Sequence, residues 1–183
     1  MKIQRLLIAN RGEIALRIIR TAREMGIATI AVYSEADVHS LHVREADEAY
    51  LIGPAPSAES YLKGDAIIEL CLEKKIDAIH PGYGFLSENA GFARAVKEAG
   101  LIFVGPDAHS MELMGDKISA KQTVKDYDVP LVPGLDHAIT DIAAAKKVAK
   151  EIGFPVLIKA SAGGGGKGMR IVDDVTEFEE AMD

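Results

Sequence analysis

The stretch from residue 159 to residue 169, KASAGGGGKGM, places four consecutive glycines between two lysines. Glycine loses more conformational freedom on folding than any other residue, so the run from Gly163 to Gly166 is costly unless its bare backbone is used. Such a backbone can present several N–H groups to one anion, and Lys159 and Lys167 add positive charge. The pattern favours phosphate binding. The alternative is a surface hairpin with a loose tip and a lysine that reaches solvent.

The glycine run is not a P-loop, whose pattern is G-x-x-x-x-G-K-[ST]. When Gly166 and Lys167 are aligned to the end of that pattern, Ser161 stands where the first glycine belongs, and Gly168 stands where Ser or Thr belongs. The flanking segments instead read as two apolar strands. We therefore expect a hairpin-like unit in which a long glycine loop, Gly163 to Gly168, folds over a triphosphate as a flap.

A lysine before the glycine loop is a second candidate for anion binding. Asp116 reads as a helix N-cap, which puts Lys117 in the first helical turn. The helix dipole disfavours a cation there unless an anion also binds to the free N–H groups. An exposed lysine without a function is the alternative.

A third candidate is the segment HPGYGFLSEN, residues 80–89. It follows a predicted strand, so it lies at the carboxyl edge of a parallel sheet, where such folds bind ligands. Tyr83 and Glu88 are placed to face a cleft at this edge. We interpret His80 as a hydrogen-bonded structural residue rather than a catalytic one.

Strand and helix patterns alternate through the first part of the chain. Strands are predicted at 5–9, 27–33, 49–53, 76–80 and 101–105, and helices at 12–26, 65–75 with Asp65 as N-cap, and 87–100 with Ser87 as N-cap. A repeated β-α-β order predicts a parallel sheet with helices on both faces. The segment IANRGEIA, residues 8–15, lacks G-x-G-x-x-G, so we expect no dinucleotide at the first strand.

After Gly105 the pattern changes. Helices are predicted at 107–115, 116–128 and 140–153 with Thr140 as N-cap, and strands at 154–161 and 168–174. Thr176 and Glu179 form a capping box for a last helix, which would be shorter than helices typically are. A two-stranded hairpin is also too little for a stable sheet. We therefore expect the second domain to be incomplete at residue 183.

Composition and charge narrow the classes of function. The formal net charge of -7 leaves no excess of Lys and Arg for a nucleic-acid backbone. The single cysteine, Cys71, allows no intrachain disulfide and is interpreted as a buried apolar residue. Neither a signal peptide nor a membrane span is visible. We expect a cytoplasmic protein that binds neither nucleic acid nor a membrane.

Five segments together resemble the biotin carboxylase component of biotin-dependent carboxylases, which are ATP-grasp enzymes. They are IANRGEIA, IGPAPSAESYL, HPGYGFLSEN, MGDK and IKASAGGGGKGMR, and they occur in the family's order across essentially the whole chain. The resemblance implies an α/β fold in three parts. A parallel, Rossmann-like pre-ATP-grasp domain occupies 1–114, a helical linker 115–130, and the start of a truncated ATP-grasp lid subdomain 131–183.

The resemblance also implies roles for particular residues. Lys117 and Lys159 match the two lysines that grip ATP, and the glycine loop matches the lid that closes over the phosphates. The ATP-binding residues implied in that loop are Gly163, Gly164, Gly165, Gly166, Lys167, Gly168 and Met169.

Two further groups of residues are implied to lie at a ligand or subunit contact. Tyr83 and Gly84 match positions on the biotin side of the cleft, and Glu88 lies nearby. The first long helix resembles the family's dimer contact. The residues implied in that contact are Arg17, Arg20 and Glu24.

The implied activity is carboxylation of biotin on a carrier protein by MgATP and bicarbonate, through carboxyphosphate. The implied partners are a biotin carboxyl carrier protein or domain, a carboxyltransferase unit and a second copy of the chain. In this family the magnesium ligands, the bicarbonate-binding arginine and the catalytic base lie beyond the position that matches residue 183. We therefore assign no catalytic or metal-binding residue within this chain, and we expect it to be inactive alone.

The sequence leaves alternatives open. The chain can be a non-catalytic structural or dimerisation module derived from the same fold, or part of a different ATP-grasp ligase. Acetyl-CoA, propionyl-CoA, pyruvate and other compounds are all open as the final carboxyl acceptor, and the carrier can lie on the same chain or on another.

Overall fold

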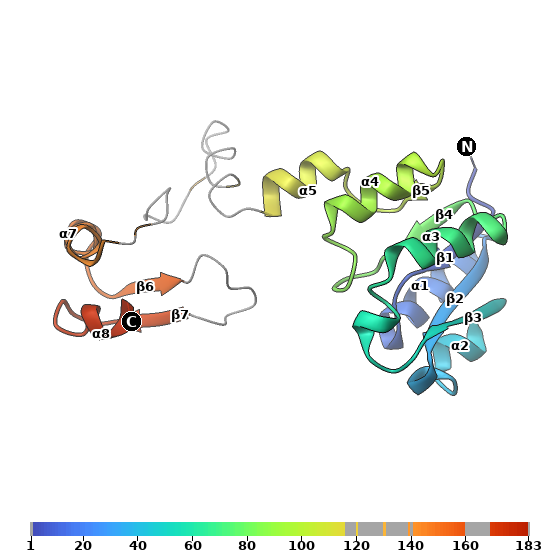
Figure 1. The fold of residues 1–183 in the computed structure, drawn as a ribbon, viewed down its shortest axis with the longest axis horizontal. Helices are drawn as coiled ribbons and strands as arrows, with labels where there is room; N and C mark the ends of the chain where they lie inside the picture. Colours follow the sequence, from blue (N-terminus) through green and yellow to red (C-terminus); the bar gives the residue numbers. More distant parts are fainter. Residues whose placement is uncertain are drawn as a thin grey trace. The chain divides into compact units, whose positions relative to one another are not determined.

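The computed structural model describes residues 2–115, 120, 130, 139, 141–159 and 169–182. The chain divides into two compact units, Met1–Gly115 (unit 1) and Asp116–Asp183 (unit 2), which are described separately. Figure 1 shows the elements of each unit. Lys117, Thr140, most of the helix predicted at 116–128 and the loop from Gly163 to Gly168 lie outside the described residues.

Unit 1 contains a five-stranded sheet with the strand order β3-β2-β1-β4-β5. Every neighbouring pair of strands is parallel, which confirms the predicted parallel α/β sheet. The strands are β1 (Arg5–Ile8), β2 (Ala28–Ser34), β3 (Glu48–Gly53), β4 (Ala78–His80) and β5 (Ile102–Phe103).

Helices connect these strands, and one more helix, α5 (Ala108–Gly115), follows the last strand. The connecting helices are α1 (Gly12–Glu24), α2 (Leu41–Glu45), α3 (Gly64–Glu73) and α4 (Ala90–Glu98), with the short 3₁₀ helices η1 (Glu35–Asp37) and η2 (Ser57–Glu59). Figure 1 shows α1, α2 and α3 beside the strands of the sheet.

The apolar strand β1 is covered on both faces, which explains why it does not alternate with polar residues. Leu6 and Ile8 belong to a buried cluster with the apolar side of α1. Leu7 points to the opposite face, where it joins a second cluster with residues of α3 and α4. Cys71 lies buried in this second cluster, and burial raises the pKa of its thiol to about 12. The thiol is therefore a small core group, as interpreted from the sequence.

The predicted helix N-caps are wrong. Asp65 lies inside the first turn of α3, where its negative charge interacts favourably with the helix dipole. Helix α4 is capped by Asn89 rather than Ser87, and the Asn89 side-chain oxygen accepts the N–H group three residues on at 2.8 Å. In unit 2 the cap is Asp141 instead of Thr140. The α3 helix begins before Asp65, with Lys63 at the N-cap position, whereas α4 and α7 begin after the predicted caps.

Unit 2 contains an antiparallel hairpin and two helices in its described part. The elements are α7 (Ile142–Ile152), β6 (Val156–Lys159), β7 (Met169–Val172) and α8 (Phe178–Met182). Val172 and Phe178 are buried together with alanines of α7. Val156 and Ile158 pack against this cluster, whereas Leu157 and Lys159 are exposed on the other side of the strand. Such alternation is typical of a strand with one buried face.

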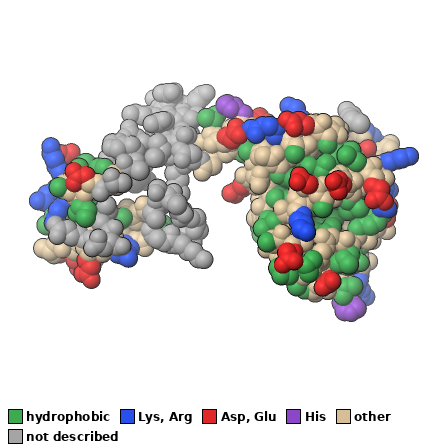
Figure 2. Space-filling model, viewed as in Figure 1, with side chains coloured by type: hydrophobic (Ala, Val, Ile, Leu, Met, Phe, Trp, Pro, Cys, Tyr) green, Lys and Arg blue, Asp and Glu red, His purple; other side chains and the backbone are tan. Residues whose placement is uncertain are grey.

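The surface of unit 1 agrees with the negative net charge. Figure 2 shows acidic side chains spread among apolar ones over the visible face of this unit. In the part of the chain that the structure describes, no helix is long and apolar enough to cross a membrane.

Candidate functional site

Two segments leave the sheet of unit 1 side by side at its carboxyl edge. Ile8, the last residue of β1, pairs with His80, the last residue of β4. The pairing continues beyond the strands, because the N–H group of Ala9 donates to the carbonyl of His80 at 2.9 Å. The chain after β1 therefore lies against the segment HPGYGFLSEN, at the edge where parallel α/β sheets bind ligands.

Asn10 joins these two segments through its side chain. Its Nδ2 amide donates to the carbonyl oxygens of Pro81 at 2.7 Å and Tyr83 at 2.9 Å. Its Oδ1 atom accepts the N–H group of Arg11 at 2.9 Å. The side chain is almost fully buried, with 3% of its surface exposed. Because it replaces water for two backbone carbonyls, this amide fixes the path of the loop after β4.

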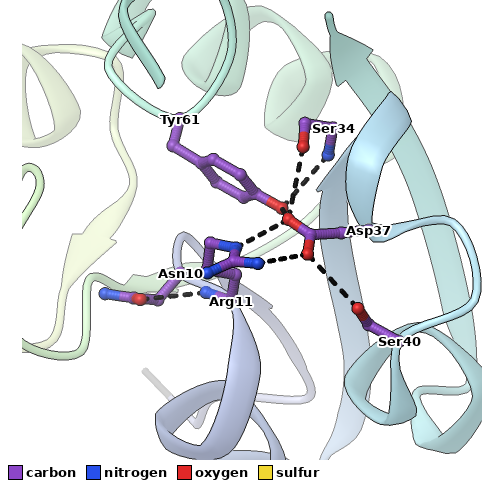
Figure 3. A network of polar contacts seen from close by, with 6 residues as sticks. All are labelled: Asn10, Arg11, Ser34, Asp37, Ser40 and Tyr61. Carbon is purple, nitrogen blue, oxygen red and sulfur yellow. Dashed lines mark hydrogen bonds and ion pairs between the residues drawn. The ribbon is translucent and has the colours of Figure 1, made fainter. Parts of the chain in front are cut away.

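Arg11 and Asp37 form a charge pair next to Asn10 (Figure 3). The guanidinium of Arg11 donates from Nε at 2.7 Å and from Nη2 at 2.5 Å to the two carboxylate oxygens. Tyr61 adds a third donor at 2.7 Å, and the hydroxyls of Ser34 and Ser40 add two longer ones. All of these donors stabilise the charged form of one buried carboxylate.

The electrostatics of this pair follow from those contacts. The hydrogen bonds from Arg11 hold the pKa of Asp37 far below its usual range, and they outweigh the opposing effect of burial. The same contact raises the pKa of Arg11. Burial, and then the hydrogen bond to Asp37, raise the pKa of Tyr61 to about 12. The three groups are therefore a permanent ion pair with a neutral phenol, suited to holding structure rather than to proton transfer.

The ring of Tyr61 also holds the loop after β4. Phe85 stacks on it with a centroid distance of 5.1 Å and an interplanar angle of 6°. Phe85 has a φ of 43°, a backbone conformation that residues other than glycine seldom adopt. The stacking compensates for this local strain.

The residues assigned to the biotin side lie on this loop. Tyr83 has 61% of its surface exposed, and its hydroxyl donates to the carboxylate of Glu13 on α1. This hydrogen bond raises the pKa of the Tyr83 phenol. Gly84 and Glu88 are exposed. His80 accepts the N–H group of Gly82 on Nδ1 at 3.1 Å, which is the structural role interpreted for it.

The residues assigned to a dimer contact all lie on the exposed side of α1. Arg17, Arg20 and Glu24 are exposed, and their spacing of three and four residues puts them on one face of the helix. Glu13, the partner of Tyr83, stands one turn before Arg17.

Only part of the nucleotide assignment falls on described residues. Lys159 is exposed at the end of β6, directly opposite Met169, whose side chain is 45% exposed. Lys117 and the glycine loop lie outside the described residues. Within the described ranges, no three His, Cys, Asp or Glu side chains gather as metal ligands.

Asn10, Arg11, Asp37 and Tyr61 were not among the candidates from the sequence. A signal for the first two existed, because a buried apolar strand followed at once by Asn-Arg places polar groups at the carboxyl edge. Asp37 and Tyr61 carry no comparable local signal, since only the fold brings them to the same point.

Comparison with known proteins gives two family matches. The model of the family "Biotin carboxylase, N-terminal domain" matches residues 2–111. The model of the family "Carbamoyl-phosphate synthase L chain, ATP binding domain" matches residues 116–183. The first match covers most of the chain.

Individual relatives align along almost the whole chain. The biotin carboxylase of Halalkalibacterium halodurans is 55% identical over 179 residues, which are 98% of this chain and 40% of that protein. The mitochondrial propionyl-CoA carboxylase alpha chain of Homo sapiens is 53% identical over 178 residues, which are 97% of this chain and 24% of that protein. The chain thus spans less than half the length of these relatives.

A solved structure shows the same fold. It is the biotin carboxylase domain dimer of Hydrogenobacter thermophilus 2-oxoglutarate carboxylase, in complex with MgADP, ADP and bicarbonate. The TM-score is 0.90 at 50% sequence identity, and the match covers 99% of this chain and 41% of that chain.

Proposed function

Because the chain belongs to the biotin carboxylase N-terminal domain family, we propose that it is the N-terminal part of an enzyme that carboxylates biotin on a carrier protein. The reaction would use MgATP and bicarbonate and proceed through carboxyphosphate. The observation that carries the proposal is the family match over residues 2–111, extended by identities above half along nearly the whole chain.

Lys117, Lys159 and the loop from Gly163 to Met169 would bind ATP. The described part of the hairpin supports this assignment, because Lys159 ends β6 in an exposed position, where its ammonium group can reach an anion. The match of residues 116–183 to an ATP-binding domain family gives independent support.

Tyr83, Gly84 and Glu88 would line the biotin side of the site. This assignment is supported by the exposure of these residues on a loop at the carboxyl edge of the sheet. The side chain of Tyr83 is oriented by Glu13. Magnesium would neutralise charge on the phosphates when it is bound, and we assign none of its ligands to this chain.

The proposed partners are a biotin carboxyl carrier protein or domain, a carboxyltransferase unit and a second copy of the chain. Arg17, Arg20 and Glu24 would contribute to the contact between copies. The relatives differ in the carboxylase to which they belong, since one is a propionyl-CoA carboxylase and the solved structure comes from a 2-oxoglutarate carboxylase. The final acceptor would therefore be set by the carboxyltransferase unit.

The test is bicarbonate-dependent ATP hydrolysis in the presence of free biotin. We expect no turnover from the 183-residue polypeptide alone, and turnover from a longer polypeptide translated from the same reading frame. Lys159→Ala in the longer polypeptide should raise the KM for ATP. Turnover by the short chain would contradict our assignment of the metal-binding and base functions outside it. A longer polypeptide without any turnover would favour a non-catalytic structural or dimerisation module.

A further inference from the structure

We propose that Asn10 is a positioning residue, whose side-chain amide holds the loop from Pro81 to Phe85 in the conformation that presents Tyr83 to biotin. The proposal rests on the proposed function, because only that function gives Tyr83 a ligand. It concerns a residue that touches no reacting atom and acts through the loop alone.

The first argument is the number of loop atoms that one side chain holds. The Nδ2 group of Asn10 donates two hydrogen bonds to the loop, one to the Pro81 carbonyl and one to the Tyr83 carbonyl. These carbonyls lie on either side of Gly82, so the amide fixes three consecutive residues at once. Among the uncharged side chains, only Asn and Gln carry a primary amide with two such donors.

The second argument is that Asn10 is itself held firmly. It follows β1, whose last residues are completely buried. The next residue, Arg11, makes a two-pronged ion pair with Asp37. Because its backbone and its neighbour are both held in place, the Asn10 amide restrains the loop atoms that are hydrogen-bonded to it.

The third argument is the fit at Gly82. Its φ is 68°, and a Cβ atom added there would lie 2.8 Å from Nδ2 of Asn10. The backbone of the loop thus approaches the amide more closely than any residue with a side chain permits. The two hydrogen bonds depend on this approach.

The fourth argument is that the far end of the loop is held through the same network. Phe85 stacks on Tyr61, and Tyr61 donates to Asp37, the partner of Arg11. The loop is therefore gripped at both ends, and Tyr83 projects between the two grips with its side chain exposed. Fixing both ends lowers the conformational freedom that substrate binding would otherwise have to remove.

The experiment has a structural arm and a kinetic arm. The structural arm compares the amide chemical shifts of Gly82, Tyr83 and Gly84 in the 183-residue chain and in its Asn10→Ala and Asn10→Asp variants. Asn10→Asp keeps the shape of the side chain, but an ionised carboxylate donates no hydrogen bond. We expect both variants to shift the three loop amides. A role in filling space alone would leave the Asp variant like the parent chain.

The kinetic arm uses the longer polypeptide with free biotin and ATP as the varied substrates. We expect Asn10→Ala to lower kcat/KM for biotin about 10- to 100-fold while the KM for ATP changes less than about twofold. The control is Thr29→Val, which removes an equally buried hydroxyl that bonds Asp47 and does not contact the loop. This control should leave the KM for biotin and the loop amides unchanged.

A second variant covers the case in which Asn10 variants do not fold. Gly82→Ala leaves Asn10 in place and pushes the loop away from it, so it should give the same kinetic split. Unmoved loop amides in the Asn10 variants overturn the inference, as does an unchanged kcat/KM for biotin. If the longer wild-type polypeptide carboxylates no biotin, the proposed function is wrong, and so is the role of Asn10 in presenting Tyr83 to biotin. The chemical shifts would still decide whether Asn10 holds the loop.

Discussion

At the scale of single residues, the Arg11–Asp37 pair is the charged contact with the largest expected effect on stability. Asp37 keeps only 3% of its side chain exposed, whereas Arg11 keeps 49%, so one partner has lost its water and the other has not. The carboxylate is compensated by five donors within hydrogen-bonding distance. Replacing the carboxylate by an amide removes the charge and one acceptor oxygen, and it places an NH2 group among these donors.

We expect Asp37→Asn to lower the free energy of unfolding by about 2–4 kcal/mol, less than for a fully buried pair because Arg11 is half exposed. Urea titration of the 183-residue chain measures this change. The matched control is Glu112→Gln, which breaks the exposed pair with Arg94 and should cost less than about 1 kcal/mol. Equal losses of unfolding free energy in the two variants would show that the Asp37 pair stabilises unit 1 no more than an exposed ion pair does.

A second residue-scale prediction concerns pH. His42 is completely buried, and neither of its ring nitrogens has a hydrogen-bond partner among the described residues. Burial lowers its pKa, and the nearby Val32 backbone and Asp37 oppose this only in part. At a pH below the ordinary histidine pKa, the unfolded chain therefore binds a proton at His42 that the folded chain does not bind. Keeping the buried imidazole neutral costs no stability above the ordinary histidine pKa. The free energy of unfolding decreases as the pH falls below that pKa.

We expect His42→Met to flatten the fall in unfolding free energy between about pH 6.5 and pH 5, where one histidine contributes at most about 1.4 kcal/mol per pH unit. Urea titrations at a series of pH values give this slope. His39→Asn, which removes an exposed imidazole, is the control. A slope that persists in the His42 variant would assign the pH dependence to other groups.

At the scale of elements, the exposed row on α1 carries a prediction about assembly. Arg17, Arg20 and Glu24 make no ion pair within the described residues, although other arginines of unit 1 do. A helix face with both signs of charge can pair with itself across a two-fold axis. This is consistent with the proposed dimer contact.

If the proposed dimer forms, we expect Arg20→Glu to weaken it at least about tenfold, because like charges would then face each other across the contact. Sedimentation equilibrium of the 183-residue chain measures the dissociation constant. Lys97→Glu makes the same change of charge on the exposed side of α4 and serves as the control. Equal effects of the two variants would place the contact elsewhere.

The elements also show what a sequence can predict. The parallel sheet could be predicted because strands such as β1 must be apolar throughout when both faces are covered. The helix caps could not, because several polar residues stand before each helix and only the final path of the chain selects one. Asn10 lies in the segment IANRGEIA, which resembles the family, but its hydrogen-bond partners are some seventy positions away in sequence. Hydrogen bonds across that separation leave no periodic signal.

At the scale of the whole molecule, the two units differ in how much core each contains. Two buried clusters cover both faces of the sheet in unit 1. In the described part of unit 2, the buried cluster consists of Ala145, Ala149, Val172 and Phe178 beside a two-stranded sheet. Hydrophobic burial is the main source of stability, and two strands alone are marginal in water.

We therefore expect a polypeptide of residues 1–115 to fold alone with a cooperative urea transition, and a polypeptide of residues 116–183 to show none. Circular dichroism measures both transitions. Because the described contacts of Asn10, Asp37 and Phe85 lie within unit 1, the amide shifts of Gly82 and Gly84 should be the same in the short polypeptide and in the 183-residue chain. Different shifts would mean that unit 2 helps to shape the loop that carries Tyr83, and the positioning assigned to Asn10 would then be shared between the units.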